Sequence, residues 1–595
     1  MMKSGLPGRA AAFRKSLMRG RKGPNNMKQQ AMNPFLPIDT YIPDGEPHVF
    51  GDRIYLFGSH DTEGGDRYCA EDNYEFWSAP LSDLSDWSCR GVSYESTQSP
   101  HYAEGYHNDL YAPDVVQGKD GRYYLYHNID GKLGTNGHNL IQVAVCDTPD
   151  GKYEYYGDVR NPDGSQYREY LDGDPAVLSD DGVIRLYHGW SLSMTAATAH
   201  RQGGENNGRP QNSAAQGVKS GTAAASSGQQ APQLPEPGTP AMQYALKGVY
   251  KMLFHREGEE VAHLKYPLMG ANEIELADDM LTIVGEPHRI VPGMFDTPKD
   301  SSFYGHAFYE AASIRKIRGT YYFIYSSEKS NELCYATSAY PDRDFVYRGT
   351  IISNGDVGYN GRKDEERLNM TANNHGSLEC VNGQWYIFYH RQTHNTTFSR
   401  QACAEKVEIL PDGSIPQVEC TSCGLNDGPL KAEGTYLSVC ACNLTNGHMP
   451  HATNTAVNAD IPFITHDADD RYITNIKNGT LIGFKYFDLA GASELTVRVR
   501  RTDVSALPFE TPAAGKAPVE GAAPAKCGSF ILASDEACSV PVGGILMRPG
   551  RENGREWISF RGTLNLQGVE NPHYSALYLK YVGEGPIDLL DIAFA

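Results

Sequence analysis

Residues 303–327, FYGHAFYEAASIRKIRGTYYFIYSS, place one carboxylate, Glu310, in apolar and aromatic surroundings just before a strand-like run. That run contains the block Tyr-Tyr-Phe at 321–323, and aromatic residues favour β-strands. A carboxylic acid in such surroundings is expected to have a raised pKa, because burial disfavours its charged form. The stretch therefore predicts a strand preceded by a buried acid.

A turn glycine followed by an aromatic strand occurs five times in the chain. The successive glycines are 70, 61, 137 and 64 residues apart, and they are Gly51, Gly121, Gly182, Gly319 and Gly383. Repeats of about this length, built from short strands, are typical of a β-propeller with one repeat per blade. The long third interval contains a polar insertion. The sequence therefore predicts an all-β chain with a five-bladed propeller.

An ionisable residue lies five to nine residues before each of these glycines. The five residues are Glu46, Asp114, Asp174, Glu310 and His375. Any one of the acids alone is typical of a turn. The innermost strand of each propeller blade starts near the central axis. Five ionisable residues at a similar position in each repeat therefore predict a ring of side chains around one pocket.

Two of the repeats contain nearly the same tetrapeptide, acid-Gly-acid-Pro. It reads Asp-Gly-Glu-Pro at 44–47 and Asp-Gly-Asp-Pro at 172–175. The similarity predicts that Glu46 and Asp174 hold equivalent positions in two blades. Asp44 and Asp172 are the alternatives.

Changes in composition divide the chain into three regions. We expect a disordered basic leader at 1–32, a propeller catalytic domain at 33–431, and a β-sandwich at 432–595. Within the propeller, residues 193–242 are rich in Ala, Gly, Ser, Gln and Pro, which predicts a disordered insertion. Residues 251–292 are expected to supply further strands, with a loop at 269–273.

In the C-terminal region, short alternating segments predict the sandwich strands. They lie at 473–489, 495–499, 528–532, 558–560 and 576–582, and an Ala/Pro/Gly stretch at 506–525 predicts a flexible loop.

Charge and hydropathy exclude several classes of partner. The formal net charge is −20, and no basic stripe follows the N-terminal residues, so a nucleic-acid partner is not expected. The chain lacks an apolar run approaching 18 residues, so no membrane-spanning segment is expected. The first thirty residues lack the continuous apolar core of a secretory signal, which predicts a cytoplasmic protein.

The twelve cysteines are too few for a disulfide framework in so long a chain. Four of them approach a zinc-binding spacing, Cys420 with Cys423 and Cys440 with Cys442. The second pair is one residue tighter than the usual zinc knuckle. Free thiols are therefore the favoured interpretation.

Acids from different blades suit the hydrolysis of a glycosidic bond. That reaction needs one acid to protonate the leaving oxygen and one base to activate water, held on opposite sides of the sugar. A third carboxylate nearby can raise the pKa of one group while another stays low, which assigns the two roles.

Five motifs in this order resemble glycoside hydrolase family 43, a family of five-bladed propeller enzymes. They are DGEPHVFGDRIYLFGSHD, YAPDVV, DGDPAV, FYEAASIRKIRGTYYFIYSS and NNHGSL, within residues 33–415. The C-terminal segments KNGTLIGFKYFDL and ALYLKYVGEGPIDLLDIAFA resemble a family 6 carbohydrate-binding module, a jelly roll.

The family's inverting mechanism implies three carboxylates on this chain. Glu310 matches the general acid and Asp174 the acid that tunes pKa and orientation. Glu46 stands where the family has an aspartate, followed by proline, that acts as the general base. Glutamate is one methylene longer than aspartate, so this position departs from the family pattern. Asp44 is the alternative base and otherwise a substrate-binding residue.

The resemblance implies three further site residues. His375 matches an axial histidine that supports a calcium ion in many relatives; the alternative is a histidine satisfied by core hydrogen bonds. Arg400 matches a substrate-contacting arginine. Asp114 is expected to line the pocket, with a turn-capping role as the alternative.

Together these features predict an inverting exo-glycosidase that acts on plant-derived oligosaccharides, with α-L-arabinofuranosyl residues as the expected target. The alternatives are a β-xylosidase, an arabinanase or galactanase of the same fold, and a carbohydrate-binding propeller that has lost catalysis.

Overall fold

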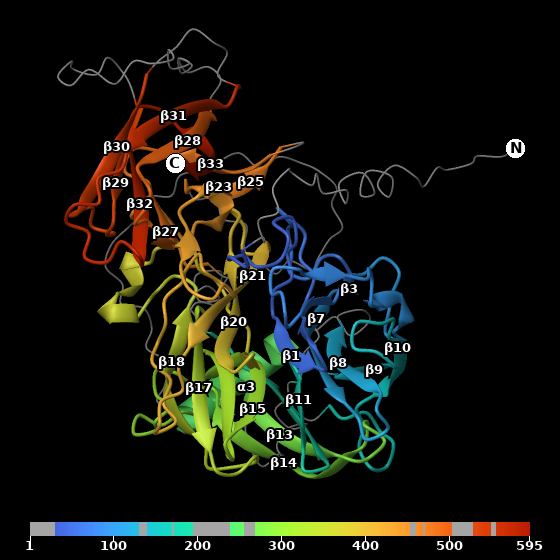
Figure 1. Cartoon of the computed structure of the whole chain (residues 1–595). Coiled ribbons are helices and arrows are strands. Elements are labelled where there is room, and N and C mark those ends of the chain that lie inside the picture. The colour runs from blue at the N-terminus through green and yellow to red at the C-terminus, as the bar shows by residue number, and fades with distance from the viewer. Residues whose placement is uncertain are drawn as a thin grey trace, which may run out of the picture. The chain divides into compact units, whose positions relative to one another are not determined.

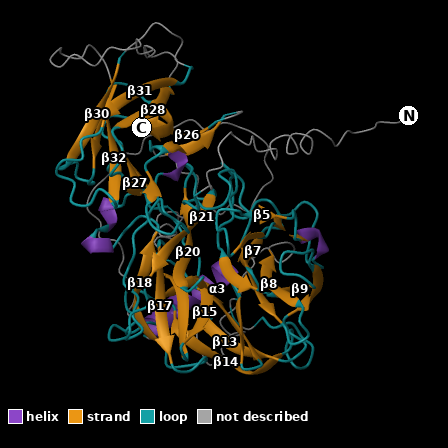
Figure 2. Cartoon of the chain, viewed as in Figure 1, coloured by secondary structure: helices purple, strands orange, loops and turns teal. Residues whose placement is uncertain are grey.

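The computed structural model describes residues 30–129, 140–168, 170, 172–193, 239–254, 268–452, 460–467, 470–502, 528–548 and 555–595. Residues 31–595 form one compact unit. Strands dominate it (Figure 2). The predicted leader and the predicted loop at 506–525 lie almost wholly outside the described residues.

Five antiparallel sheets follow one another in chain order, from blue to orange in Figure 1. The first contains β1 (Glu46–Phe50), β2 (Arg53–Phe57), β4 (Trp77–Pro80) and β5 (Ser88–Cys89). The second contains β7 (Leu110–Gln117), β8 (Tyr123–Ile129), β9 (Gln142–Cys146) and β10 (Glu154–Asp158). The third contains β11 (Ala176–Asp180), β12 (Val183–Trp190), β13 (Gly270–Leu276) and β14 (Ile283–Pro292).

The fourth sheet contains β15 (Phe308–Ile317), β16 (Thr320–Ser327), β17 (Glu332–Ser338) and β18 (Val346–Ser353). The fifth contains β19 (Leu378–Val381), β20 (Gln384–Gln392) and β21 (Arg400–Val407). A small ribbon of β3 (Asn73–Tyr74) and β6 (Tyr94–Glu95) extends the first blade. The five-bladed propeller predicted from the repeats is confirmed.

The repeated glycines occupy the turns between the first two strands of the blades. All five have a left-handed φ, between 64° and 84°, a conformation that glycine adopts without steric cost. In the β15–β16 hairpin, Arg318 and Gly319 both have positive φ, which matches the twist of the strands they join. The periodic signal in the sequence is thus a hairpin turn repeated once per blade.

The first and last blades are joined near the ends of the propeller region. Gly45, just before β1, forms a parallel bridge with Gly376, just before β19. The side chain of Asn33 bonds to the backbone of Ala404 in β21 through both its amide nitrogen and its oxygen. These contacts bring residues more than 300 positions apart into one ring.

Residues 240–254 differ from the prediction. They form helix α3 (Pro240–Phe254), where the sequence analysis expected the end of an insertion and further strands. Met242, Leu246 and Tyr250 recur every four residues and pack on Leu268 and Phe295, and this spacing is the helical signal that was missed. The predicted loop at 269–273 is also wrong, because those residues enter the buried strand β13.

Two six-stranded sheets make up the C-terminal region. One contains β22 (Leu430–Lys431), β24 (Asn443–Thr445), β27 (Leu481–Asp488), β29 (Gly528–Ala533), β30 (Pro541–Met547) and β32 (Ser575–Val582). The other contains β23 (Gly434–Leu437), β25 (Phe463–His466), β26 (Arg471–Ile476), β28 (Glu494–Arg501), β31 (Ile558–Thr563) and β33 (Ile587–Phe594). Apolar residues from both sheets form one core, as expected of a β-sandwich.

Each predicted sandwich segment contains a strand, but β22, β23, β24, β25, β30 and β33 were not among the predicted segments. The segment at 473–489 forms two strands, β26 and β27, separated by a turn at Gly479 with φ 92°. Because β22 pairs with β27, this sheet includes residues just before the domain boundary predicted at Ala432. The boundary itself stays a prediction.

No helix within the described part of the chain is long and apolar enough to cross a lipid bilayer.

Candidate active site

A cavity of about 350 Å³ lies where strands from several blades begin. Five of the predicted site residues line it: Asp44, Asp174, Glu310, His375 and Arg400. They come from the first, third, fourth and fifth blades, so the predicted convergence on one pocket holds for these residues. Glu46 and Asp114 are not among the lining residues.

Glu310 is the third residue of β15 and lies half-buried in the cavity wall. The Asn373 side-chain amide donates a hydrogen bond to Glu310 Oε1 at 3.2 Å. Burial, followed by repulsion from Asp174, raises the pKa of Glu310 to about 8. This carboxyl group therefore carries a proton at neutral pH.

Asp44 has the opposite electrostatic setting, although it is more deeply buried than Glu310. Arg400 Nη1 donates to Asp44 Oδ1 at 2.7 Å. Burial alone would raise the pKa of Asp44, but attraction to the charged guanidinium of Arg400 is the largest effect in the other direction, and the pKa is lowered. Asp44 is therefore ionised at neutral pH.

Asp174 connects the acid and the histidine. Its Oδ2 accepts the backbone N–H of Ala311, the residue after Glu310, at 2.8 Å. His375 Nδ1 lies 3.8 Å from the same oxygen and 4.0 Å from Asp44 Oδ1. Burial, only partly offset by His375, raises the pKa of Asp174. Asp174 thus fixes the backbone beside Glu310 and repels its charged form.

The predicted equivalence of Glu46 with Asp174 is wrong by two residues. Asp44 and Asp174 each lie two residues before the first residue of a strand, β1 and β11, and both have left-handed φ, 57° and 47°. Glu46, by contrast, is already the first residue of β1. Asp44, and not Glu46, is therefore the first-blade equivalent of Asp174, because equivalent positions are counted from the start of the strand and not from the proline.

Glu46 and Asp114 belong to a separate buried group. Glu46 Oε2 accepts bonds from Arg315 at 3.1 Å and Ser313 at 3.2 Å. Asp114 accepts His48 Nε2 at 2.7 Å and the Val177 N–H at 2.7 Å. Glu46, His48 and Asp114 place their ligand atoms within 4.8 Å of one another. Asp114 thus links its strand to β11 of the third blade, which is neither the predicted place in the pocket lining nor the turn cap that was its alternative.

Arg400 is held mainly by carboxylates, and its Nη2 also donates to Cys69 Sγ at 3.6 Å. Besides Asp44, it donates from Nε to Asp61 Oδ2 at 2.8 Å and from Nη2 to Asp61 Oδ1 at 3.0 Å. A guanidinium fork matches a carboxylate in this bidentate way. Its geometry thus fits the orientation of Asp44 more closely than contact with a sugar.

His390 is a site residue that the sequence analysis missed, although its strand was recognised. Its Nδ1 accepts the Asp44 N–H at 3.3 Å, and its Nε2 donates to the Asn373 carbonyl at 2.9 Å. Burial lowers the pKa of His390 to about 3, so the ring is neutral and this tautomer is fixed. The ring bonds to the backbone of both Asp44 and Asn373.

Aromatic side chains were also missed as members of the site. They line the same cavity and comprise Tyr68, Tyr111, Trp190, Tyr309 and Phe398. Rings beside polar groups suit a sugar, which offers both apolar C–H faces and hydroxyl groups. Tyr309 could have been predicted as a site residue, because it immediately precedes Glu310 in the sequence.

Comparison with known proteins places the chain in a family. The sequence profile of Glycosyl hydrolases family 43 matches residues 260–415. A Xylosidase/arabinosidase of Thermoclostridium stercorarium is 41% identical over 487 residues, which cover 80% of this chain and 86% of that protein. The chain belongs to glycosyl hydrolase family 43. It is a glycoside hydrolase.

Two further family 43 relatives are more distant. Xylosidase/arabinosidase 43A of Humicola insolens is 27% identical over 370 residues, which cover 60% of this chain and 89% of that protein. The crystal structure of a family 43 arabinoxylan arabinofuranohydrolase from Bacillus subtilis has 18% identity and a TM-score of 0.42, covering 95% of this chain and 97% of that one.

The calcium ion that family 43 implies can be tested against the buried polar atoms. His375 Nε2 and Glu46 Oε1 are both buried without a hydrogen-bond partner in the described structure. Carboxylate oxygens and water are the ligands that Ca²⁺ prefers. The Glu46 oxygen, and His375 Nε2 through water, would therefore suit a hydrated Ca²⁺ ion. The four cysteines near a zinc spacing are not among the described clusters of possible ligands, and all four are free thiols.

Arg400→Lys is expected to move the acidic limb of the kcat/KM profile to higher pH. Lysine keeps the positive charge but lacks the planar, two-pronged guanidinium group. It therefore binds Asp44 less firmly, and the pKa of Asp44 rises. The pH profile of kcat/KM measures this shift. Arg391→Lys is the matched control, because Arg391 is also buried but bonds to the carbonyls of Ala441 and Cys442. An unchanged limb in Arg400→Lys would contradict this role.

Glu310→Gln is expected to stabilise the fold at neutral pH. The pKa of Glu310 is raised in the folded state, so its contribution to stability is complete below its unfolded pKa and is lost as the pH rises towards about 8. Glutamine does not titrate. The melting temperature of the variant should therefore exceed that of the parent increasingly between about pH 5 and 8. A constant difference across this range would show that Glu310 does not titrate as described.

Proposed function

We propose that the chain is an exo-acting, inverting glycosidase that removes terminal L-arabinofuranosyl and D-xylosyl residues from oligosaccharides. The observation that carries this proposal is the pair of carboxylates lining one cavity, Asp44 with a lowered pKa and Glu310 with a raised one. An inverting glycosidase needs one ionised and one protonated carboxyl group at the same sugar.

In this proposal, Glu310 is the general acid. It protonates the leaving glycosidic oxygen, and Asn373 orients its carboxyl group. Asp174 keeps that group protonated until the substrate arrives, through repulsion, and fixes the backbone at Ala311. The repulsion and the hydrogen bond to the Ala311 N–H both act on Glu310 and not on the sugar.

Asp44 is the general base in this proposal. It accepts a proton from the water that attacks the anomeric carbon, while Arg400 and His390 hold its carboxylate and backbone. A residue whose carboxylate lines the cavity can reach that water, which supports Asp44 over Glu46. Calcium near His375 and Glu46 would supply positive charge behind the pocket and satisfy their unpaired atoms.

The choice of sugars rests on the relatives. The Thermoclostridium stercorarium, Humicola insolens and Bacteroides ovatus proteins are each named for both xylosidase and arabinosidase activity. These names support both sugars equally. The preference for arabinofuranosyl residues that the resemblance implies stays a prediction.

Hydrolysis of matched aryl glycosides tests the proposal. We expect turnover of both the α-L-arabinofuranoside and the β-D-xyloside, and initial release of the inverted anomer, as followed by proton NMR. Release of oligosaccharides from arabinan, or of galactose from galactan, would instead support the polymer-acting alternatives. Absence of turnover on every glycoside, with sugar binding retained, would overturn the proposal in favour of a binding propeller.

A further inference from the structure

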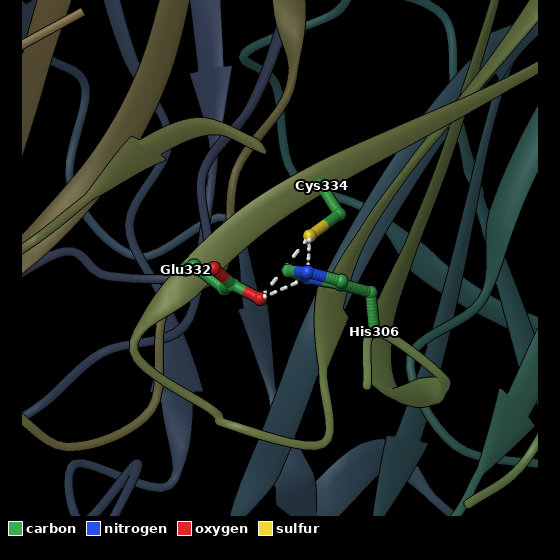
Figure 3. A group of neighbouring side chains, drawn as sticks. All are labelled: His306, Glu332 and Cys334. Carbon is green, nitrogen blue, oxygen red and sulfur yellow. Dashed lines mark hydrogen bonds and ion pairs between the residues drawn. The ribbon is translucent and has the colours of Figure 1, made fainter. Parts of the chain in front are cut away.

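A second cluster of metal-ligand side chains lies in the fourth blade, outside the cavity lining. It consists of His306, Glu332 and Cys334, whose ligand atoms lie within 4.8 Å of one another. Figure 3 shows the imidazole, the carboxylate and the thiol pointing towards a common centre. We propose that this cluster binds a Zn²⁺ ion that fastens the segment leading into β15 to strand β17.

The backbone explains why the three side chains meet. Glu332 and Cys334 are two residues apart in β17, so their side chains lie on the same face of the strand. His306 lies in a turn just before β15, where its N–H bonds to the Phe303 carbonyl and its own carbonyl accepts the Tyr325 hydroxyl. Each ligand is thus held by a strand or a hydrogen-bonded turn.

The distances between the ligand atoms are close to those of a tetrahedral zinc site. His306 Nδ1 lies 2.7 Å from Glu332 Oε1 and 3.8 Å from Cys334 Sγ, and Oε1 and Sγ are 3.5 Å apart. Zinc bond lengths to nitrogen, oxygen and sulfur place such atoms about 3.3–3.6 Å apart. To admit the ion, the Nδ1–Oε1 pair must separate by about 0.6 Å and the Nδ1–Sγ pair must approach by about 0.2 Å.

The chemistry of the donor set favours zinc over the hard cations. Thiolate and imidazole are ligands of Zn²⁺, whereas Ca²⁺ and Mg²⁺ take oxygen ligands. Three protein ligands leave a fourth position for water or for Glu328, a buried carboxylate near enough to His306 and Glu332 for their charges to affect it. Upon binding, Cys334 loses its thiol proton to solvent and no electron is transferred.

Neighbouring groups hold the ligands and leave a path for the ion. Glu332 Oε2 accepts the Thr350 hydroxyl at 3.0 Å, and Tyr347 stacks on the His306 ring with centroids 4.5 Å apart. Such outer contacts orient metal ligands. The His306 side chain is 24% exposed, so the ion can enter from solvent. Lys329 Nζ lies 3.6 Å from Glu332 Oε1, but its side chain is 35% exposed and can turn to water.

The proposed zinc site lies near the strand that carries Glu310, although its residues do not line the cavity. Glu310 lies four residues after His306, and β15 pairs with β16, which pairs with β17. An ion joining His306 to β17 would fix the start of the strand that carries the acid. We therefore regard the three ligands as positioning residues.

Cobalt substitution of the full-length protein tests the site. Metal-stripped, reduced protein is titrated with Co²⁺, and the thiolate-to-cobalt charge-transfer band is recorded. Bound zinc is counted separately by elemental analysis after zinc loading and dialysis. We expect the band in the parent protein, its loss in Cys334→Ser, and one zinc equivalent fewer in Cys334→Ser and in His306→Asn.

Cys380→Ser is the matched control, because Cys380 is a half-buried thiol on β19 in another blade. It should keep both the band and the zinc content. His306→Asn alters a partly exposed turn residue, so it gives an answer even if Cys334→Ser does not fold. An absent band in the parent, or an unchanged band in Cys334→Ser, would overturn the proposal. These readouts do not depend on turnover, so they are independent of the proposed glycosidase activity.

Discussion

Glu310→Gln is expected to lower kcat for glycosides with poor leaving groups by a factor on the order of 10²–10⁴. Glutamine has almost the same shape, but it cannot donate the proton that the leaving oxygen needs. A glycoside whose leaving group is already a weak base needs no such proton. The loss should therefore shrink sharply for activated aryl glycosides, and a series of aryl substrates measures this change.

The same variant should lose the alkaline limb of its pH profile. In the parent protein the pKa of Glu310 is about 8, so activity falls as that carboxyl group ionises. Glu405→Gln is the matched control, because Glu405 also has a pKa raised to about 8 but bonds to Tyr389 and Thr421, outside the cavity lining. Equal losses in the two variants, or a loss independent of the leaving group, would refute the acid role.

Asp44→Asn is expected to lower kcat by a factor on the order of 10²–10⁴ for every substrate, whatever its leaving group. The amide cannot accept the proton of the attacking water, and that step is needed in all cases. Glu46→Gln should retain most of the activity, because Glu46 faces Arg315 and Ser313 and does not line the cavity. Kinetics on the aryl series separate the two residues.

The comparison is informative because the two residues are alternatives for one role. If Glu46→Gln abolishes turnover while Asp44→Asn retains it, the base assignment is reversed. Thermal melting of both variants shows whether a loss of activity reflects unfolding, since each removes a charge partner from a buried arginine. A fold-intact Asp44→Asn with parental kcat would rule out this carboxylate as the base.

Much of the fold could be predicted because its signal is local. A hairpin turn needs a residue with left-handed φ, and the five glycines that supply it mark the five blades. Of the ionisable residues that precede these hairpins, Asp174, Glu310 and His375 line one cavity, whereas Glu46 and Asp114 do not. Glu310 was evident because its apolar neighbours are adjacent in sequence.

The choice between Asp44 and Glu46 could not be made from the sequence. The motif repeats acid-Gly-acid-Pro, and in a continuous strand residues two apart would share a face. Asp44 lies before β1 with a left-handed φ of 57°, whereas Glu46 is already in the strand. Only the folded backbone therefore decides which acid enters the cavity. Helix α3 was missed because its apolar spacing follows a polar stretch and its partner Phe295 lies some fifty residues later.

The sequence by itself determined the number of blades, the sandwich and the set of candidate acids, because turn conformation and strand alternation are properties of neighbouring residues. Only the tertiary structure decided which groups share a pocket and how they titrate. Arg400 lies 356 positions from Asp44, yet it lowers the pKa of that acid. His306, Glu332 and Cys334 likewise meet only because β17 folds back beside the turn before β15. Charge interactions act over a few ångströms of space, and chain distance does not reveal which residues come that close.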